Sequence, residues 1–360
     1  MSKVDDISQV MLSRIRTNAY RGKIPGERSL AAEFSVDFKT VNRAIDVLVE
    51  QGTLVRKRGL GTFIAEANQR RNLTIGLCFF KHSDPGRDPV FTRFLSGMNT
   101  SITALGSRLV ITALRDVANP GQLPAEQAAA FRKQVLAADP DGLVYLGNVE
   151  TGLIDQLRSD RPTIVATQVP DELLFDCVRR DIAAGVAQAV GHLHRLGHRR
   201  IAFATYEYGH STISYDLLEK ERGYRASAAA LGIREHVLRL THPPEDKLVR
   251  LLLEADPRPT AIVCAENDLA LSLFTHGPGC GLALPADLAV IAFDDGDMGL
   301  HTRPTLSSVI AFGEELAQLA LNRLIGKLDG RIAGRIDEVV PCPFVERESS
   351  GGALPVDRTR

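Results

Sequence analysis

The sequence predicts a small N-terminal winged helix-turn-helix, an α+β unit, followed by a larger two-lobed α/β domain with parallel sheets. The first 65 residues contain three stretches with helical apolar spacing and then two short strand-like stretches around glycines. From Leu73 onward, short apolar strands alternate with stretches long enough for crossover helices, which is typical of parallel sheets covered by helices. Because residues 73–348 are too many for one hydrophobic core, we expect two lobes.

The N-terminal unit is predicted from apolar spacing and from the positions of glycines. Helices are expected over residues 4–20, 26–34 and 39–51. Gly26 stands at the N-cap position of the second helix, where glycine is acceptable. Gly59 and Gly61 lie between two short strands of residues 53–65, so the hairpin turn is expected to need positive φ. Three helices and a hairpin in so short a stretch indicate a winged helix.

The C-terminal part is predicted to contain seven apolar strands. They are expected at residues 73–80, 107–114, 141–146, 162–167, 199–205, 260–265 and 288–293. These patterns divide the chain into four segments. They are a winged helix (residues 1–65), a polar linker (66–72), a two-lobed domain that binds an effector and dimerises (73–348) and a disordered tail (349–360).

Composition and charge restrict the class of protein. Hydrophobic residues make up 44% of the chain and charged residues 24%, which is ordinary for a soluble protein. The chain has no apolar run of about 18 residues, and its N-terminus has charges where a secretory signal would be apolar, so we expect a cytoplasmic, nucleoid-associated protein. Residues 1–71 carry 13 Lys and Arg against 8 Asp and Glu, a net charge of +5, whereas the remainder carries −6. A basic head on an acidic body suggests that the head meets a polyanion.

The third predicted helix presents polar side chains opposite its apolar face, as a DNA recognition helix must. Lys39, Asn42 and Arg43 lie at i, i+3 and i+4 on the outward side. Lysine and arginine match the acceptors of guanine, and asparagine matches the edge of adenine. Arg28 and Thr40 could reach phosphates. The wing, at Arg58 and Gly59, is expected to contact the flanking backbone or the minor groove.

The segment IPGERSLAAEFSVDFKTVNRAIDVLVEQGTLVRKRGLGTFIA resembles the GntR-type winged-helix family. That family shows a Pro-Ser-Glu-Arg opening, a Val-Ser-Arg-x-Thr-Val start of the recognition helix and a Gly-x-Gly-Thr-Phe-Val wing. This chain departs from the pattern at Asp37-Phe38, which replaces the Ser-Arg pair whose arginine often contacts DNA in the family. Phe38 cannot donate a hydrogen bond. It is either buried or packed against sugar edges, or it contacts DNA as a wedge or on a base methyl group.

Residues 72–348 resemble the LacI/GalR-type regulatory domain, which is related in fold to periplasmic sugar-binding proteins. The resemblance is carried in order by DPVFTRFLSGM, AVGHLHRLGHRRIAF, RPTAIVCAENDLAL and the closing VPCPFVERESS. A GntR-type head on such a body is similar in build to the arabinose-responsive repressors. The resemblance implies a homodimer that binds operator DNA and a sugar or sugar-derived effector, with release of DNA by the effector the commoner outcome in such hybrids.

Polar residues that follow predicted strands are candidates for the effector site, because ligands bind at the carboxyl ends of parallel strands. Asp84, Asn267 and Asp294 have this position. A sugar also needs an aromatic ring against its C–H face, which Phe91 could supply. By resemblance, the family's pocket asparagine and aspartate fall on Asn267 and Asp294.

Three further positions leave alternatives open. By resemblance, the pocket arginine of the family falls on Lys220, unless a shift in register places Arg222 there. Asp181 either caps the helix that follows it or meets the ligand. Asp268 is expected to cap a helix beginning at Leu269.

An enzyme is the main alternative class, and the sequence disfavours it. No G-x-G-x-x-G follows the first strand of the body, and the chain has no P-loop and no G-x-S-x-G motif. We therefore expect no catalytic activity and no cofactor. No metal is expected either, because His192 and His194 at i, i+2 do not share a helix face and the five cysteines form no C-x-x-C pair, which favours buried free thiols. The remaining alternatives are a constitutive dimeric DNA-binding regulator with a degenerate pocket and a sugar-acting enzyme.

Overall fold

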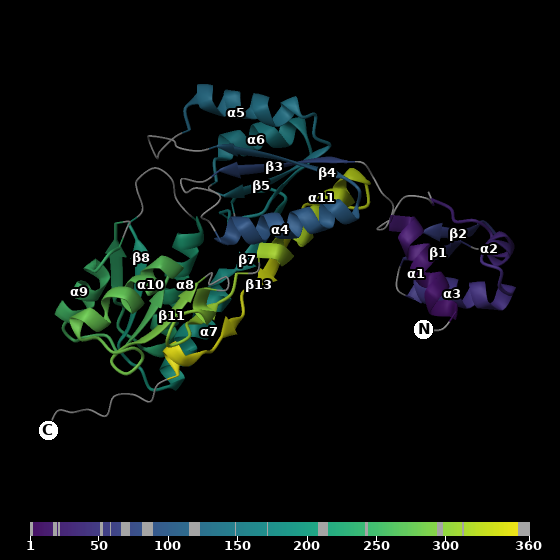
Figure 1. The fold of residues 1–360 in the computed structure, drawn as a ribbon. Helices are drawn as coiled ribbons and strands as arrows, with labels where there is room; N and C mark the ends of the chain where they lie inside the picture. The colour runs from purple at the N-terminus through teal and green to yellow at the C-terminus, as the bar shows by residue number, and fades with distance from the viewer. Residues whose placement is uncertain are drawn as a thin grey trace. The chain divides into compact units, whose positions relative to one another are not determined.

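The computed structural model describes most of the chain (Figure 1). The described residues are 3–16, 20, 22–50, 53–57, 59–65, 73–80, 89–114, 123–147, 149–170, 172–207, 215–241, 244–293, 298–311 and 313–351. The expected linker lies outside them, as do three predicted site residues, Arg58, Asp84 and Asp294. None of the helices in these ranges is long and apolar enough to cross a membrane.

The head contains three helices and a hairpin, as the sequence predicts. The elements are α1 (Lys3–Arg16), α2 (Glu27–Glu33), α3 (Phe38–Glu50), β1 (Leu54–Lys57) and β2 (Gly61–Ile64), with β1 and β2 antiparallel. Met11, Leu30 and Ile45 contribute fully buried side chains from the three helices to one core. Gly59 and Gly61 have φ of +75° and +108°, which confirms the predicted turn.

The first lobe of the body is built on a six-stranded sheet in the order β13-β7-β6-β5-β3-β4. Its strands are β3 (Thr74–Phe80), β4 (Arg108–Leu114), β5 (Gly142–Gly147), β6 (Thr163–Val165), β7 (Cys177–Asp181) and β13 (Asp337–Pro341). From β13 through β7, β6 and β5 to β3, each pair of neighbours is parallel. Two pairs of helices cover the sheet, α5 (Ala125–Ala137) with α6 (Thr151–Asp160), and α4 (Pro89–Ala104) with α11 (Gly313–Leu328) (Figure 1).

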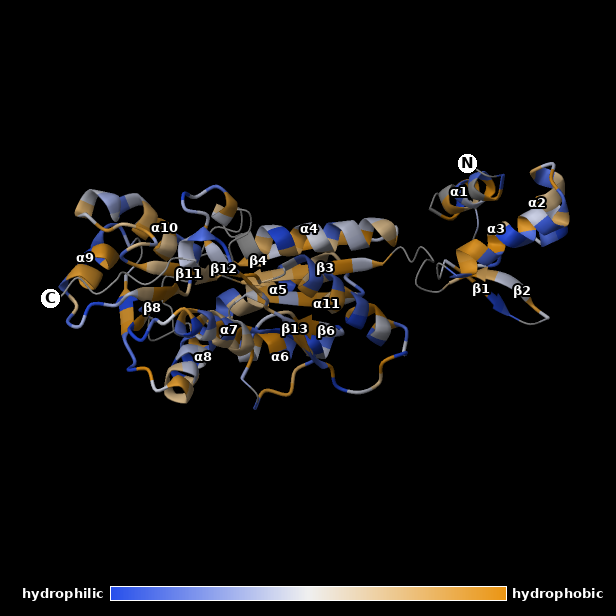
Figure 2. Ribbon diagram, turned by 90° about the horizontal axis from the view of Figure 1, so that it is seen from below, coloured by the Kyte–Doolittle hydropathy of each residue, from blue (hydrophilic) through white to orange (hydrophobic). Residues whose placement is uncertain are grey.

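The second lobe has a six-stranded sheet in the order β14-β12-β11-β10-β8-β9, in which only the β12–β14 pair is antiparallel. Its strands are β8 (Ile201–Tyr206), β9 (Val237–Leu240), β10 (Ala261–Cys264), β11 (Ala289–Phe293), β12 (Ser307–Val309) and β14 (Phe344–Val345). One core joins the sheet to α7 (Ile182–Arg195) and α8 (Tyr215–Leu231), and another joins it to α9 (Lys247–Glu254) and α10 (Asn267–His276). Figure 2 shows the apolar strands in orange between helices that carry hydrophilic residues.

All seven predicted strands are present, and the two-lobed α/β fold with parallel sheets is confirmed. Five short strands were not expected: β7, β9, β12, β13 and β14. The ordered body also extends past its expected end, because Ser349 and Ser350 are fully buried and the Ser349 hydroxyl donates to the carbonyl of Val290 at 2.6 Å.

Three connections between the lobes follow from the order of the described elements, and they are neighbours. They join β7 to α7, β12 to α11 and β13 to β14. Pro341 at the end of β13 pairs with Asp181 at the end of β7, and Val309 at the end of β12 pairs with Phe344 in β14. The three connections therefore lie side by side.

Candidate functional site

The recognition helix α3 is anchored through one face and exposed on the other. Val41, Ala44, Ile45 and Leu48 are fully buried. Lys39 and Arg43 are exposed, and Asn42 is half-buried. Arg28 is exposed in the first turn of α2. The cations predicted at Arg28, Lys39 and Arg43 are thus open to a partner.

Asp37 caps the N-terminus of α3. Its carboxylate accepts a hydrogen bond from the backbone N–H of Thr40 at 2.9 Å and another from the Thr40 hydroxyl at 2.7 Å. These hydrogen bonds lower the pKa of Asp37 below its ordinary value, the side-chain bond with Thr40 having the largest effect. The predicted phosphate contact of Thr40 would require its hydroxyl to release Asp37, because a phosphate oxygen accepts and does not donate.

Replacing Asp37 by alanine is expected to lower the melting temperature of the head at neutral pH. Since the folded-state pKa of Asp37 is lowered, its stabilisation is present above the unfolded pKa of about 3.9 and is lost as the pH falls through the lower folded value. Thermal melts followed by circular dichroism at pH 7 and near pH 3 should show the difference between wild type and variant shrinking in acid. Glu50→Ala, exposed at the other end of α3, should produce no such destabilisation.

Arg56 joins the wing to the recognition helix. Its guanidinium lies 2.7 Å from an oxygen of Asp46 and donates to the amide oxygen of Asn42 at 2.5 Å, with Glu27 at 3.6 Å. The amide of Asn42 is therefore oriented by the protein before any DNA contact. In the second strand of the wing, the Phe63 ring lies 5.2 Å from the Lys57 ammonium, and the turn ahead of it is closed by a hydrogen bond from Leu60 N–H to the Lys57 carbonyl at 2.9 Å.

In the body, Lys220 is deeply buried, with 1% exposure. Its ammonium donates to the carbonyl of Ala265 at 2.9 Å and to a carboxylate oxygen of Glu266 at 3.1 Å. It also lies 4.9 Å from the centre of the Phe293 ring. Lys220 thus lies against the carboxyl ends of β10 and β11, where parallel strands bind ligands.

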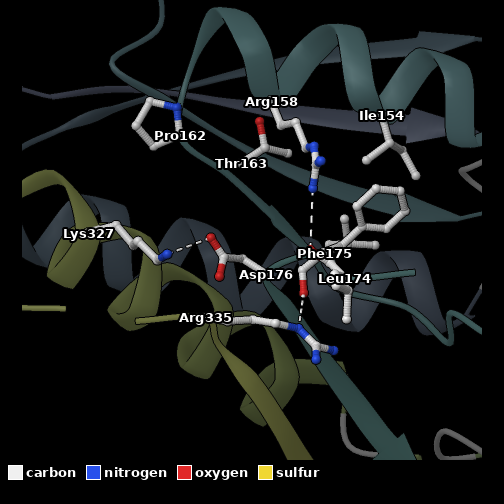
Figure 3. Close-up of a pocket in the computed structure, with 10 residues that line it drawn as sticks. Ile154, Arg158, Pro162, Thr163, Leu174, Phe175, Asp176, Lys327 and Arg335 are labelled. Carbon is white, nitrogen blue, oxygen red and sulfur yellow. Dashed lines mark hydrogen bonds and ion pairs between the residues drawn. The ribbon is translucent and has the colours of Figure 1, made fainter. Parts of the chain in front are cut away.

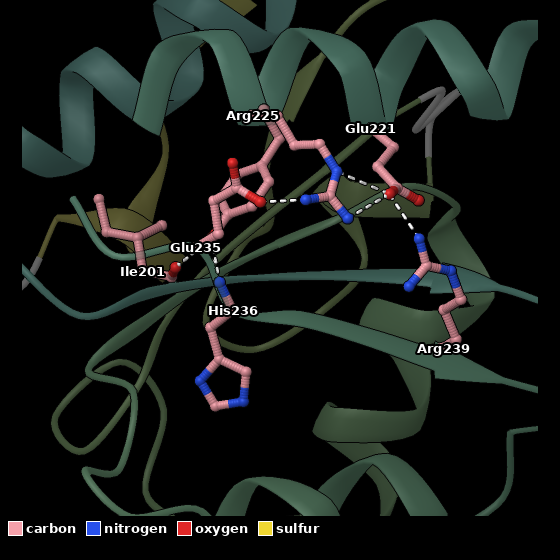
Figure 4. Close-up of polar contacts among 7 residues, drawn as sticks. Ile201, Glu221, Arg225, Glu235, His236 and Arg239 are labelled. Carbon is pink, nitrogen blue, oxygen red and sulfur yellow. Dashed lines mark hydrogen bonds and ion pairs between the residues drawn. The ribbon is translucent and has the colours of Figure 1, made fainter. Parts of the chain in front are cut away.

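Lys220 and Arg222 differ in where their side chains lie. The Arg222 side chain is 76% exposed and bonds Glu219 at 2.6 Å. Lys220 alone of the two reaches the strand ends. Glu221 lies between them in the chain. It fixes this part of α8 by accepting hydrogen bonds from Arg225 at 2.9 Å and from Arg239 in β9 at 2.5 Å (Figure 4).

Asn267, the first residue of α10, is buried directly after β10 and beside Glu266 in the chain, so the structure brings it to the same sheet edge as Lys220. The expected capping role of Asp268 is wrong, because α10 begins at Asn267 and not at Leu269. Asp268 instead accepts from the Tyr206 hydroxyl and from the backbone N–H of Leu269.

Two other predicted ligand residues lie in the first lobe or at its border. Asp181 caps α7 by accepting from the N–H of Ala184 at 3.1 Å, so the capping alternative is confirmed and a ligand contact stays a prediction. Phe91 is 7% exposed and packs on Phe79 with ring centres 4.3 Å apart, which leaves little of its ring for a sugar.

Sequence reasoning missed two residues near these sites. Phe293, the last residue of β11, places its ring beside Lys220, and the only signal was its position directly before Asp294. Arg180 is 6% exposed and forms an ion pair with Asp216 of α8, and nothing in the local sequence indicates that partner.

A cavity of about 470 Å³ in the first lobe lies away from this sheet edge (Figure 3). It is found at the amino ends of β6 and β7, whereas Lys220 and Asn267 follow the carboxyl ends of strands. Its cations already have partners: Lys327 lies 2.6 Å from Asp176, Arg335 donates to the Phe175 carbonyl at 3.1 Å and Arg158 donates to the Leu174 carbonyl at 3.3 Å.

The histidines and cysteines take positions in the packing. His192 contacts Ser350 at 3.3 Å and His198 contacts Thr260 at 3.0 Å, and burial lowers the pKa of both rings. In the described ranges, no group of three or more His, Cys, Asp or Glu side chains is placed to hold a metal ion. Four cysteines are buried as expected, but Cys280 is exposed because it ends a short surface helix of the 3-10 type.

Two family models match the chain. The model for bacterial regulatory proteins of the gntR family covers residues 5–64, and the model for a periplasmic binding protein-like domain covers residues 190–350. The arabinose metabolism transcriptional repressor of Geobacillus stearothermophilus is 25% identical over 335 residues, which cover 89% of each chain.

Solved structures show the same fold. The lac repressor dimer bound to operator and the anti-inducer ONPF aligns with a TM-score of 0.67 and 18% identity, over 78% of this chain and 95% of that one. A complex of the transcriptional regulator CelR with cellobiose aligns with a TM-score of 0.65 and 19% identity, over 91% of this chain and all of that one. The curated relatives are transcription regulators and not enzymes.

Proposed function

Because the chain combines a gntR-type regulatory head with a periplasmic binding protein-like domain, we propose that it is a transcriptional repressor controlled by a small sugar or sugar-derived effector. The head binds operator DNA, and the effector binds between the lobes of the body and changes operator affinity. One combination of features carries the proposal. The recognition helix of the head exposes basic side chains, and Lys220 of the body is buried and hydrogen-bonded at the carboxyl ends of two strands.

The DNA side of the proposal rests on Lys39, Asn42 and Arg43. Both cations are exposed, and the Asn42 amide is oriented by Arg56, so the three side chains can meet base edges in the major groove. Arg28 and the wing around Gly59 would contact the flanking backbone.

The effector side rests on chemistry suited to hydroxyl groups. The carboxylate of Glu266, 35% exposed, accepts hydrogen bonds, the Lys220 ammonium donates them, and the Phe293 ring lies beside that ammonium. A sugar presents donors, acceptors and an apolar face to such a set. Polar groups gathered at the carboxyl ends of neighbouring strands favour a ligand site over a degenerate pocket.

The lac repressor structure of this fold is a dimer on its operator, and we propose the same assembly here. Two heads would then read the halves of a pseudo-palindrome. An effector that binds the closed arrangement of the lobes better than the open one shifts their equilibrium. Coupling of about 1–3 kcal/mol would change operator affinity about 5- to 150-fold.

The proposal is tested with the full-length protein in two steps. Selection from a random DNA pool should enrich a pseudo-palindromic sequence, whose affinity is then measured by fluorescence anisotropy with pentoses, hexoses and glycosides. One class of sugar should change the affinity at least five-fold. Enrichment of no sequence would contradict the DNA-binding role, and a response to no sugar would contradict the effector role.

Replacing Arg43 by alanine is expected to weaken binding to the selected operator about 5- to 150-fold per half-site, because an arginine that bonds a base contributes about 1–3 kcal/mol. Anisotropy titration at fixed salt measures the loss. Arg250→Ala removes the same charge from an exposed position on α9 and should leave affinity unchanged. Equal behaviour of the two variants would remove Arg43 from the interface.

A further inference from the structure

The start of the recognition helix carries an exposed aromatic side chain. Phe38 is the first residue of α3 and is 46% exposed, so burial is excluded among the alternatives that the sequence leaves open for it. Its neighbours in the first turn are not equally available. The exposed Asp37 accepts from Thr40, so Phe38 and Lys39 are the exposed side chains at this turn that take no part in the cap.

The position of Phe38 places it among the base-reading side chains. In helix-turn-helix proteins, the N-terminal residues of the recognition helix contact base edges. Phe38 lies four residues before Asn42 and therefore on the same side of the helix, one turn earlier. The exposed Lys39 and Arg43 occupy the adjacent row.

A phenylalanine ring selects a particular feature of DNA. It can neither donate nor accept a conventional hydrogen bond, so it gains nothing from the polar edges of guanine, adenine or cytosine. The one apolar group on a base edge in the major groove is the C5 methyl of thymine. Contact with that methyl removes apolar surface of both groups from water.

We propose that Phe38 reads a thymine methyl in each operator half-site, next to the bases met by Lys39 and Asn42. This proposal rests on the proposed DNA-binding function and adds a specificity-determining residue to it. The same chemistry makes the site sensitive to methylation, because 5-methylcytosine presents a methyl group at the corresponding place.

The test removes only the methyl groups. Operators selected with the full-length protein are resynthesised with uracil in place of each thymine in turn, because uracil keeps every hydrogen-bonding group of thymine. Burial of one methyl-sized group predicts a loss of affinity of about four-fold for one half-site and about fifteen-fold for both. The loss should occur at one thymine per half-site and disappear in Phe38→Ala.

Lys39→Ala is the matched control, since it should weaken binding to all operators but keep the difference between thymine and uracil. At the sensitive position, 5-methylcytosine paired with guanine should bind more tightly than cytosine paired with guanine. Because Phe38 is exposed, Phe38→Ala should melt like the wild type. The proposal is overturned if uracil is tolerated at every thymine, or if the uracil effect persists in Phe38→Ala. Either result would leave an enriched operator, and hence the proposed function, in place.

Discussion

Replacing Lys220 by methionine is expected to abolish the effector response while leaving operator binding intact. Methionine fills a similar volume but cannot donate to an effector, to the Ala265 carbonyl or to Glu266. Hydrogen bonds that involve a charged group contribute about 1.5–3 kcal/mol, so effector affinity should fall about 10- to 150-fold. Calorimetric titration of the sugar identified by the operator assay measures this loss, and anisotropy without sugar checks that DNA binding is unchanged.

Arg222→Met is the control for this prediction. It removes the same charge two residues away on α8, but from a side chain that is 76% exposed, so effector affinity should stay within about two-fold. The variant Lys220→Arg keeps the positive charge but replaces the ammonium. Comparison with Lys220→Met therefore distinguishes loss of the charge from loss of the ammonium. If Arg222→Met lost the response and Lys220→Met kept it, the site would have to be moved along the helix.

Replacing Ile45 by alanine is expected to unfold a large part of the head and so remove operator binding. Ile45 is fully buried in the core that all three helices share, and such a truncation costs about 2–5 kcal/mol. A unit of this size has only about 3–9 kcal/mol of stability in total. Calorimetry should show the transition of the head shifted to lower temperature, whereas the transition of the body and sugar binding stay unchanged.

Val10→Ala tests whether this effect comes from the core. Val10 is also an aliphatic residue of the head, but it is 41% exposed in α1, so its truncation should change stability by no more than about 0.5 kcal/mol. If Ile45→Ala melted and bound DNA like Val10→Ala, the packing described for the head would be wrong.

The fold was predictable wherever apolar runs are long and buried on both faces, as in β3, β5 and β11. Strand β7 was missed because it reads Cys-Val-Arg-Arg-Asp, and two arginines do not indicate a buried strand. Arg180 is nevertheless buried there, because Asp216 pairs with it from a helix 36 residues further along the chain. Local periodicity carries no information about a partner at that distance.

The candidate site was predictable in location but not in detail. Strand ends identified Asn267, whereas only the family resemblance pointed to Lys220 or Arg222, and their burial in the structure shows that Lys220 is the one that reaches the strand ends. Phe38 was left between burial and a contact with DNA, and in the structure it is about half exposed at the first position of α3. Whether a stripe of apolar residues meets a partner along its whole length depends on tertiary packing.

The three neighbouring connections between the lobes limit the mechanical degrees of freedom of the body. Two lobes joined by one connection can bend and twist independently, but three adjacent connections, flanked by the pairs Asp181–Pro341 and Val309–Phe344, are expected to resist twisting. We therefore expect the easiest motion of the lobes to be bending about a single axis that crosses all three connections. Under the proposed function, an effector that favours closure would therefore produce one rotation of a lobe, whatever the chemistry of that effector.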